Sequence, residues 1–295
     1  MKQELEWPPL DRCVPRWTGR GFELGAEATS VLSYHATRSG WSEELTDFHE
    51  ESAGGDHYID VASRKCALLG LEKVLRQASP TILEVGCSSG FFLRLLRESA
   101  PHATVIGADF ISGPLFKLAS DLPDVPLLQF DLTRCPFEKP TFDAVVLLNV
   151  LEHIEDDQLA LEKVYGMLKP GGTLVIEVPA GPALYDYYDE HLMHYRRYDL
   201  ARLRSQVGSA GFRILKASHL GFFLYPPFWY TKKINRRKES ALSKQDREAL
   251  VNQDIQSGAR NPLMHGLMGL ELALGRLVSF PNGIRCLVWA EKPAV

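Results

Sequence analysis

The feature that most constrains this chain is a regular alternation of short apolar runs with helical segments between residues 80 and 178. Five runs of four to six residues occur, at 82–85, 104–108, 125–130, 144–149 and 173–178. Segments between them carry apolar residues at spacings of three and four, which is typical of amphipathic helices. Strands that alternate with helices in this way form a parallel sheet with helices on both faces. We therefore expect a doubly wound, Rossmann-like α/β fold.

Two further runs, at 212–218 and 284–290, complete a predicted seven-stranded, mostly parallel sheet. Roughly 60 residues separate these two runs, which is too many for a hairpin turn. We therefore divide the chain into a core at 56–218 and 283–295 and a helical insertion at 219–282. The N-terminal arm, 1–55, has no clean hydrophobic period, and we expect irregular structure or short helices that form a lid over the core.

The ends of two helices are also predicted. Asp56 is expected to cap a helix, and Asn261-Pro262 is a favourable start for a helix of the insertion. A stripe of leucines follows, and we expect it to pack on the sheet or in a dimer contact, with the wall of an acceptor pocket as the alternative. The stripe consists of Leu263, Leu267, Leu270, Leu274 and Leu277.

Composition narrows the class of protein. With 33 basic and 37 acidic residues the net charge is −4, so a strongly basic nucleic-acid-binding face is not expected. Five single cysteines form neither a disulfide framework nor a zinc module and suit a reducing compartment. The longest apolar stretch, 221–230, falls short of the about 20 residues that a membrane span needs. We expect a cytoplasmic protein without a secretory signal or transmembrane segment.

The segment 84–90, with the sequence EVGCSSG, directly follows the first predicted strand and opens a helix. Its two glycines permit a tight turn and close approach to a ligand, and a helix N-terminus offers free N–H groups. The G-x-G-x-x-G spacing of dinucleotide-binding proteins is absent, so a nicotinamide oxidoreductase is the less favoured alternative. The acidic Glu84 would repel a pyrophosphate but suits a ligand that bears an ammonium group.

Two further acids close the second and third predicted strands. Asp109 would accept the ribose hydroxyls of a nucleoside, and Asp131 would accept from an adenine amino group. Each acid taken alone has a structural alternative, because aspartate often caps helices and starts turns. All three acids fall on one edge of the predicted sheet, where open α/β sheets bind ligands.

These segments, in order and spacing, resemble the class I S-adenosylmethionine-dependent methyltransferases. The resemblance covers residues 57–218 and the last strand. It rests on 84–90, Asp109, Asp131-Leu132, the FDA…NVLEH segment at 142–153 and LKPGG at 168–172. HYRRY at 194–198 resembles a bacterial subgroup of that family. The family implies S-adenosylmethionine as methyl donor and S-adenosylhomocysteine as product.

The resemblance implies where the methionine end of the cofactor would lie. Gly86 and Gly90 would bracket it, with Glu84 supporting the loop and Cys87 lining it. The backbone carbonyl of Asn149 would accept from the methionine amino group.

The resemblance also implies the contacts of the nucleoside end. Asp109 would hold the ribose and Phe110 would cover the adenine, while Asp131 and Leu132 would read the adenine edge. Ser88 departs from the family pattern, because many members have a glycine there; a small serine is expected to fit.

The methyl acceptor would lie near the loop that follows the fifth strand. Methyl transfer is an in-line displacement, and a hydroxyl or acidic-carbon acceptor also needs a base. The candidate bases are His191, His194 and His153. The alternative is a structural loop in which Arg196 and Arg197 pair with the acids at 186, 189 and 190 and the histidines bind backbone carbonyls or cap a helix. We predict no metal site, because the H-x-x-H spacing lacks a third ligand.

We therefore expect methyl transfer to an oxygen, nitrogen or carbon atom of a small-molecule metabolite, by a monomer or homodimer. One alternative is a non-catalytic partner subunit that keeps the S-adenosyl ligand site. Another is a methyltransferase for a lipid-linked or glycan acceptor. The basic residues at 232–238 leave contact with a membrane surface as an alternative to a solvated face.

Overall fold

The core of the protein is an eight-stranded sheet, seen in a computed structural model that describes residues 5–35, 55–238 and 261–294. Across the sheet the strands are β10 (Arg213–Leu220), β11 (Arg285–Glu291), β9 (Leu168–Pro179), β8 (Phe142–Leu148), β5 (Thr81–Val85), β6 (Thr104–Asp109), β7 (Leu127–Gln129) and β4 (Val31–Ser33). The six strands from β9 to β4 are parallel, and β11 runs antiparallel to both of its neighbours. The Rossmann-like fold is confirmed, and the sheet has one strand more than predicted.

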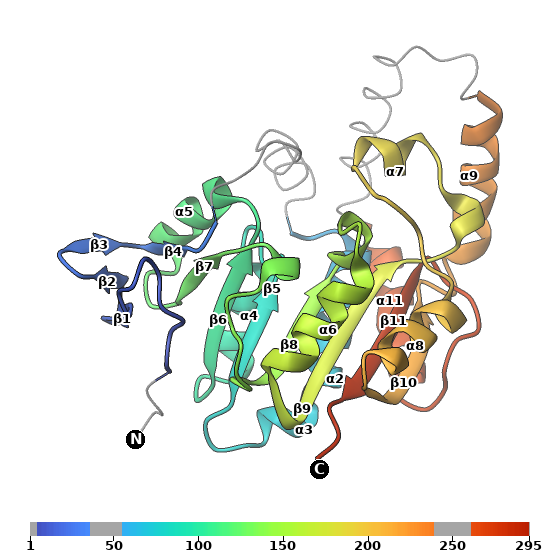
Figure 1. Cartoon of the computed structure of the whole chain (residues 1–295). Coiled ribbons are helices and arrows are strands. Elements are labelled where there is room, and N and C mark those ends of the chain that lie inside the picture. Colours follow the sequence, from blue (N-terminus) through green and yellow to red (C-terminus); the bar gives the residue numbers. More distant parts are fainter. Residues whose placement is uncertain (1–4, 36–54, 239–260, 295) are drawn as a thin grey trace.

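Helices cover both faces of the sheet (Figure 1). The α-helices are α2 (Tyr58–Gly70), α3 (Glu72–Leu75), α4 (Phe91–Ser99), α5 (Ser112–Asp121), α6 (Asp157–Met167), α7 (Tyr187–His191), α8 (Leu200–Ser209), α9 (Tyr225–Lys238) and α11 (Pro262–Gly275). Side chains alternate along a strand, so neighbours in β5 enter different cores. Ile82 packs with α2, α4 and α5, whereas Leu83 packs with α6 and α8. Two apolar layers thus hold the strand ends in fixed positions.

The described part of the N-terminal arm, residues 5–35, contains four short strands joined by irregular segments and no helix, so irregular structure is observed and the expectation of short helices is wrong. β1 (Arg16–Trp17), β2 (Phe22–Leu24) and β3 (Glu27–Thr29) form a small antiparallel sheet, and β4 pairs with β7 in the main sheet. Strands of two or three residues are too short to show a hydrophobic period, and the pairing of β4 with β7 is non-local. The part of the predicted lid at 36–54, with Trp41, lies outside the described residues.

The insertion packs on α2. Helix α2 begins at Tyr58, so the residue that precedes it is His57 and not the predicted cap Asp56. The predicted start of α11 is confirmed, because Oδ1 of Asn261 accepts the N–H groups of Leu263 and Met264. The carboxylate of Glu271, 1% exposed, accepts three N–H groups from the turn at 221–223, at 2.6, 3.0 and 3.2 Å. This carboxylate fixes α11 to the end of β10.

The leucine stripe of α11 does not pack on the sheet. Four of its leucines are exposed: Leu263, Leu270, Leu274 and Leu277. The face that packs on α2 instead carries Met268 and Glu271, which are buried. Packing on the sheet was the wrong prediction, because this helix is apolar on more than one side and periodicity did not identify its buried face; the dimer contact and the pocket wall stay predictions.

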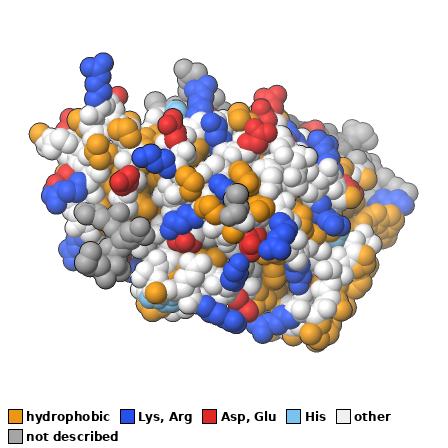
Figure 2. Space-filling model, turned by 60° about the horizontal axis from the view of Figure 1, so that its bottom comes forward, with side chains coloured by type: hydrophobic (Ala, Val, Ile, Leu, Met, Phe, Trp, Pro, Cys, Tyr) orange, Lys and Arg blue, Asp and Glu red, His pale blue; other side chains and the backbone are white. Residues whose placement is uncertain are grey.

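No helix of the described residues combines the length and the apolar character needed to cross a membrane. Figure 2 shows the end of the molecule that lies at the bottom of Figure 1, where both termini are found. Acidic and basic side chains are interspersed over this face. The carboxyl ends of the parallel strands lie at the opposite end, beneath α7.

Candidate functional site

The strand order places a switch point, where open α/β sheets have their ligand crevice, at the carboxyl end of β5. From β5 the chain continues to β6 and β7 on one side, and then to β8 and β9 on the other side. The loops after β5 and β8 therefore diverge from neighbouring strands, and open α/β sheets bind ligands at such a switch point. The loops that carry the predicted site residues all leave the sheet at this edge.

The loop at 86–90 has a backbone that requires its glycines. Gly86 and Gly90 have φ angles of 76° and 72°, in the left-handed region. A Cβ atom at Gly86 would lie 2.5 Å from Cγ2 of Val150, and one at Gly90 would lie 2.6 Å from Cδ1 of Leu118. The loop is thus packed closely against α5 and against the segment that follows β8. Ser88 also has a positive φ, 47°.

Asp109 connects this loop to the end of β6. Its Oδ2 accepts the N–H of Ser88 at 3.0 Å and its Oδ1 accepts the N–H of Ile111 at 3.0 Å. Burial raises the pKa of Asp109 above its ordinary value, and these backbone hydrogen bonds oppose that rise. Each oxygen has a second lone pair, so the half-buried carboxylate can still accept from a ligand.

Glu84 is a second carboxylate at the same place. It is buried at the end of β5, and its Oε2 has no hydrogen-bond partner among the described residues. Burial, and then the negative charge of Asp109, raise the pKa of Glu84 well above its ordinary value, while Arg64 partly offsets the rise. Two neighbouring carboxylates with raised pKa values favour a ligand that brings positive charge and hydrogen-bond donors.

The other predicted cofactor residues lie at this edge in different settings. Oδ1 of Asp131 accepts the N–H of Thr133 at 2.8 Å, so that the turn-starting role considered for Asp131 is observed. Leu132 and Cys87 are buried, and Phe110 is 39% exposed. Asn149, the remaining cofactor candidate, has a φ of 54° and donates its N–H to the backbone carbonyl of Glu177.

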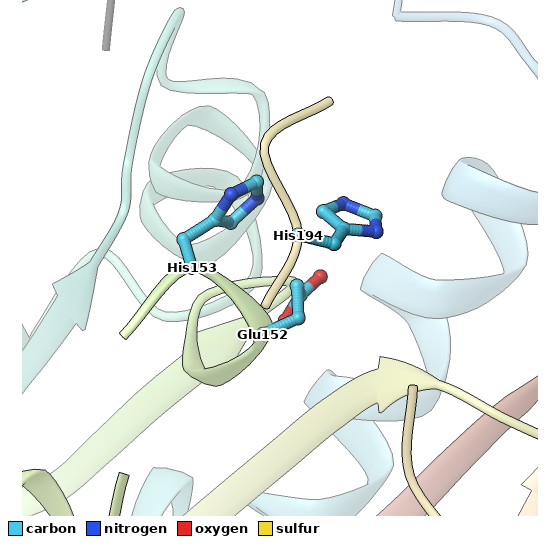
Figure 3. Close-up of side chains that lie close together, drawn as sticks. All are labelled: Glu152, His153 and His194. Atoms are coloured by element: carbon cyan, nitrogen blue, oxygen red, sulfur yellow. The ribbon is translucent and has the colours of Figure 1, made fainter. Parts of the chain in front are cut away.

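On the other side of the crevice, three side chains from two segments meet. Glu152 and His153 belong to the 3-10 helix η2 (Leu151–His153) that follows β8, and His194 lies in the loop after α7. One ligand atom from each lies within 4.8 Å of the others, and Figure 3 shows the three side chains converging. The rings of His153 and His194 have centroids 4.7 Å apart at 75°. We call these three residues the EHH cluster.

The carboxylate of Glu152 is unusual for a buried group. The residue is 0% exposed, and neither carboxylate oxygen has a hydrogen-bond partner in another described residue. Burial raises the pKa of Glu152 to about 8. The backbone carbonyl of Glu152 accepts the N–H of Tyr195 at 2.8 Å, which holds the loop after α7 against η2.

His194 is oriented by a buried aspartate. Its Nδ1 lies 2.9 Å from Oδ1 of Asp189, and Oδ2 of Asp189 accepts from Nε of Arg197 at 2.8 Å. Burial alone would raise the pKa of Asp189, but the hydrogen bonds from His194 and Arg197 hold it well below its ordinary value. Burial lowers the pKa of His194, and Asp189 partly opposes this. An ionised carboxylate can only accept, so Nδ1 of His194 donates to Asp189, and the lone pair of a neutral ring then lies on Nε2.

The structural alternative for this loop is observed in part. Arg197 pairs with Asp189, as considered, whereas Arg196 pairs with Asp157 of α6 at 2.8 Å. Lys232 of α9 is neither solvated nor at a membrane-facing surface: it is 5% exposed, and its Nζ lies 2.5 Å from Oδ1 of Asp186. The insertion thus places a positive charge beside Asp186 at the start of α7, because α9 passes beside α7.

Among the candidate bases, the structure brings His153 and His194 together and leaves His191 outside the EHH cluster, half-buried at the end of α7. Sequence reasoning missed Glu152 and Asp189 as site residues. Glu152 directly precedes His153 after a buried strand, and this was the available signal. Asp189 lies five residues before His194 on a short helix, a spacing that does not by itself predict contact.

Comparisons with known proteins agree on the core. Residues 83–176 match a family described as "Methyltransferase domain". The chain is similar to a demethylmenaquinone methyltransferase of Thermus thermophilus, with 34% identity over 125 residues, which is 40% of this chain and 54% of the relative. The chain spans about half the length of the curated relatives it matches.

Two solved structures share the fold. One is a putative sarcosine dimethylglycine methyltransferase from Galdieria sulphuraria, with a TM-score of 0.57, 13% identity, and coverage of 85% of this chain and 99% of the other. The second is Haemonchus contortus phosphoethanolamine N-methyltransferase 2 in complex with phosphomonomethylethanolamine and S-adenosylhomocysteine, with a TM-score of 0.56, 18% identity, and coverage of 87% and 59%. Residues 83–176 thus match a methyltransferase domain, and the chain shares the fold of these two methyltransferases.

Within this methyltransferase domain, the matched residues end inside β9. The glycine loop, Asp109, Asp131 and the Glu152-His153 pair lie inside the match. His194 and its partner Asp189 lie beyond it, as do the insertion and the N-terminal strands. The part of the chain outside the match therefore supplies one side of the EHH cluster.

Proposed function

We propose that this chain binds S-adenosylmethionine and transfers its methyl group to a nucleophilic oxygen, nitrogen or carbon atom of a small molecule. The observation that carries the proposal is the pair of carboxylates, Glu84 and Asp109, beside a glycine loop at the switch point of the sheet. The cofactor has a cationic sulfonium and ammonium group and two ribose hydroxyl donors, so its charge and donors complement this pair.

The methionine end is proposed to lie over the loop at 86–90, between Gly86 and Gly90. Glu84 supports the loop from below, and Cys87 lines it from its buried position. The carbonyl of Asn149 would accept from the amino group, since Asn149 has a positive φ at the end of β8 and its N–H is already committed to the backbone of β9.

The nucleoside end is proposed to lie toward β6 and β7. Asp109 would accept the ribose hydroxyls with the lone pairs that the backbone leaves available. The exposed ring of Phe110 would cover the adenine, and Asp131 and Leu132 would read its edge. Oδ1 of Asp131 already accepts from Thr133, so the adenine amino group would use the other oxygen.

The acceptor is proposed to bind between the methyl group and the EHH cluster. In-line attack requires the nucleophile, the methyl carbon and the sulfur to be aligned, and a buried site excludes water that would compete. A loop histidine would take the acceptor's proton. Asp189 prepares His194 for this role by keeping the lone pair on Nε2, while His153 and His191 are the other candidates.

The test is a binding measurement followed by an acceptor screen. We expect the purified chain to bind S-adenosylhomocysteine in calorimetry and to transfer labelled methyl groups from S-adenosylmethionine. The screen includes demethylmenaquinone, because a relative bears that name, together with soluble alcohols, phenols and amines. Absence of S-adenosylhomocysteine binding would overturn the proposal; binding without transfer to any acceptor would favour a non-catalytic subunit.

A further inference from the structure

Glu152 presents a buried carboxyl group whose partner is missing. Both of its carboxylate oxygens lack a hydrogen-bond partner in another described residue, and the side chain points into the EHH cluster (Figure 3). A buried polar group normally has a partner, because leaving one unpaired costs free energy. The two nearby groups are imidazole rings, from His153 and His194.

The set of donor atoms matches one class of ligand. Two imidazole nitrogens and one carboxylate oxygen bind divalent transition metals such as Zn²⁺ and Mn²⁺, with further positions left for water or substrate. Ligands around such an ion lie about 3 to 3.5 Å apart, from bond lengths of about 2.1 Å. The ligand atoms of the cluster lie within 4.8 Å of one another, so an inward shift of about 1 Å closes the site.

The surroundings of His194 provide a second, independent observation. Histidines that bind metals usually donate their other ring N–H to a carboxylate, which fixes the ring and its tautomer. Asp189 does this at 2.9 Å, and Arg197 holds Asp189 in turn at 2.8 Å. A ring held in this way presents the lone pair of Nε2 for ligation.

We propose that Glu152, His153 and His194 bind a divalent transition-metal ion on the acceptor side of the crevice. Glu152 is the third ligand that the H-x-x-H segment at 191–194 lacked. The two histidine ligands are His153 and His194, not His191 and His194. Asp189 is a positioning residue for the site, acting through His194.

The role of the ion in catalysis rests on the proposed function. At an open position the ion would supply positive charge to an acceptor oxygen and lower the pKa of an acceptor hydroxyl. Ligation and proton acceptance use the same lone pair of His194, so a bound ion replaces that base in preparing the acceptor. This narrows the acceptor class to molecules with an oxygen that binds the ion.

The experiment measures metal binding to the full chain after removal of metals by a chelator. Mn²⁺ and Zn²⁺ are titrated by calorimetry, and metal content after dialysis is measured by mass spectrometry. Mn²⁺ avoids the thiols of the five cysteines, because thiolates favour softer ions. We expect one saturable site per chain for both ions.

Variants separate this site from adventitious binding. Glu152→Gln keeps the size of the side chain and removes its charge, and we expect at least tenfold weaker binding of both ions. Asp189→Asn leaves the three ligands in place and is expected to weaken binding about 10- to 100-fold, as loss of such supporting carboxylates does. His219→Gln, which alters a histidine on β10 outside the cluster, is the matched control and should bind like the wild type.

Absence of a one-to-one site in the wild type would overturn the proposal, as would equal affinity in wild type and folded Glu152→Gln. Near-ultraviolet circular dichroism verifies folding, and His153→Gln serves as the second ligand variant if Glu152→Gln fails to fold. S-adenosylhomocysteine binding is measured on the same samples. If the chain binds S-adenosylhomocysteine but no metal, only the metal site is overturned. If it binds metal but no S-adenosylhomocysteine, only the proposed function is overturned.

Discussion

Nδ1 of His194 lies 2.9 Å from Oδ1 of Asp189, and this contact joins the loop that follows α7 to the helix itself. Asp189 is 0% exposed and also faces the cations of Arg197, at 2.8 Å, and Lys232, at 3.6 Å. One carboxylate therefore holds a histidine of the site and compensates two buried positive charges from different segments.

Replacement of Asp189 by asparagine is expected to lower stability. Because Arg197 and Lys232 would remain buried with less negative charge beside them, we expect the free energy of unfolding to fall by about 3 kcal/mol. Urea denaturation measures the change. Glu190→Gln, on the exposed side of the same helix, is the control and should change it by less than about 0.5 kcal/mol. Equal stability of the two variants would contradict the role given to Asp189.

Asp109→Ala is expected to weaken binding of S-adenosylhomocysteine by roughly tenfold or more, the loss of about one charge-assisted hydrogen bond. Calorimetry measures the affinity. The exposed Asp121→Ala on α5 should leave it unchanged. Asp109 also accepts the N–H of Ser88, and Asp109→Asn keeps one acceptor oxygen while it removes the charge. A smaller loss of affinity in Asp109→Asn than in Asp109→Ala would show what the acceptor oxygen contributes without the charge. Wild-type affinity in Asp109→Ala would disprove the ribose contact.

Gly90→Ala and Gly166→Ala are expected to have opposite effects. Gly90 has a φ of 72°, and a Cβ atom there would lie 2.6 Å from Leu118, so we expect a loss of stability of at least about 1 kcal/mol and weaker nucleoside binding. Gly166 lies within α6 with nothing within 4 Å of its Cβ position, so alanine should stabilise the helix by up to about 1 kcal/mol. Thermal unfolding of both variants tests this; a neutral Gly90→Ala would show that the loop is not tightly packed.

Glu271→Ala is expected to destabilise the junction between α11 and β10. The change leaves the N–H groups of Gly221, Phe222 and Phe223 without their acceptor, and we expect a cost of about 2 to 4 kcal/mol. Leu277→Ser, at an 87% exposed position after the same helix, is the control with little expected change. Equal unfolding midpoints in urea would show that the insertion is held by other contacts.

His219 predicts a pH dependence of stability away from the site. Burial lowers the pKa of His219, while its hydrogen bond to the carbonyl of Phe280 opposes this. As pH falls below the unfolded pKa of about 6.5, the unfolded chain binds a proton more readily than the folded chain, so the stability due to this group is lost. The stability difference between wild type and His219→Gln should therefore shrink on acidification from about pH 7.5 to pH 5.5. A constant difference would contradict the shift.

The order of elements in the core was readable from the sequence alone. The apolar runs at 82–85 and 144–149 recur as β5 and β8, because a strand buried on both faces needs a continuous apolar run. The glycines of the loop at 86–90 were also readable, since their positions require left-handed backbone. Such features are determined by residues close together in the chain.

Contacts between distant segments required the tertiary structure. β4 joins the sheet through pairing with β7, about a hundred residues further along, and Lys232 is buried because α9 passes beside α7. The EHH cluster likewise depends on the loop after α7 folding back onto η2. No local period records these approaches, because each depends on where the ends of two packed elements come to lie. The sequence by itself thus determined the methyltransferase-like core and its glycine loop, and tertiary packing decided which side chains meet in the EHH cluster.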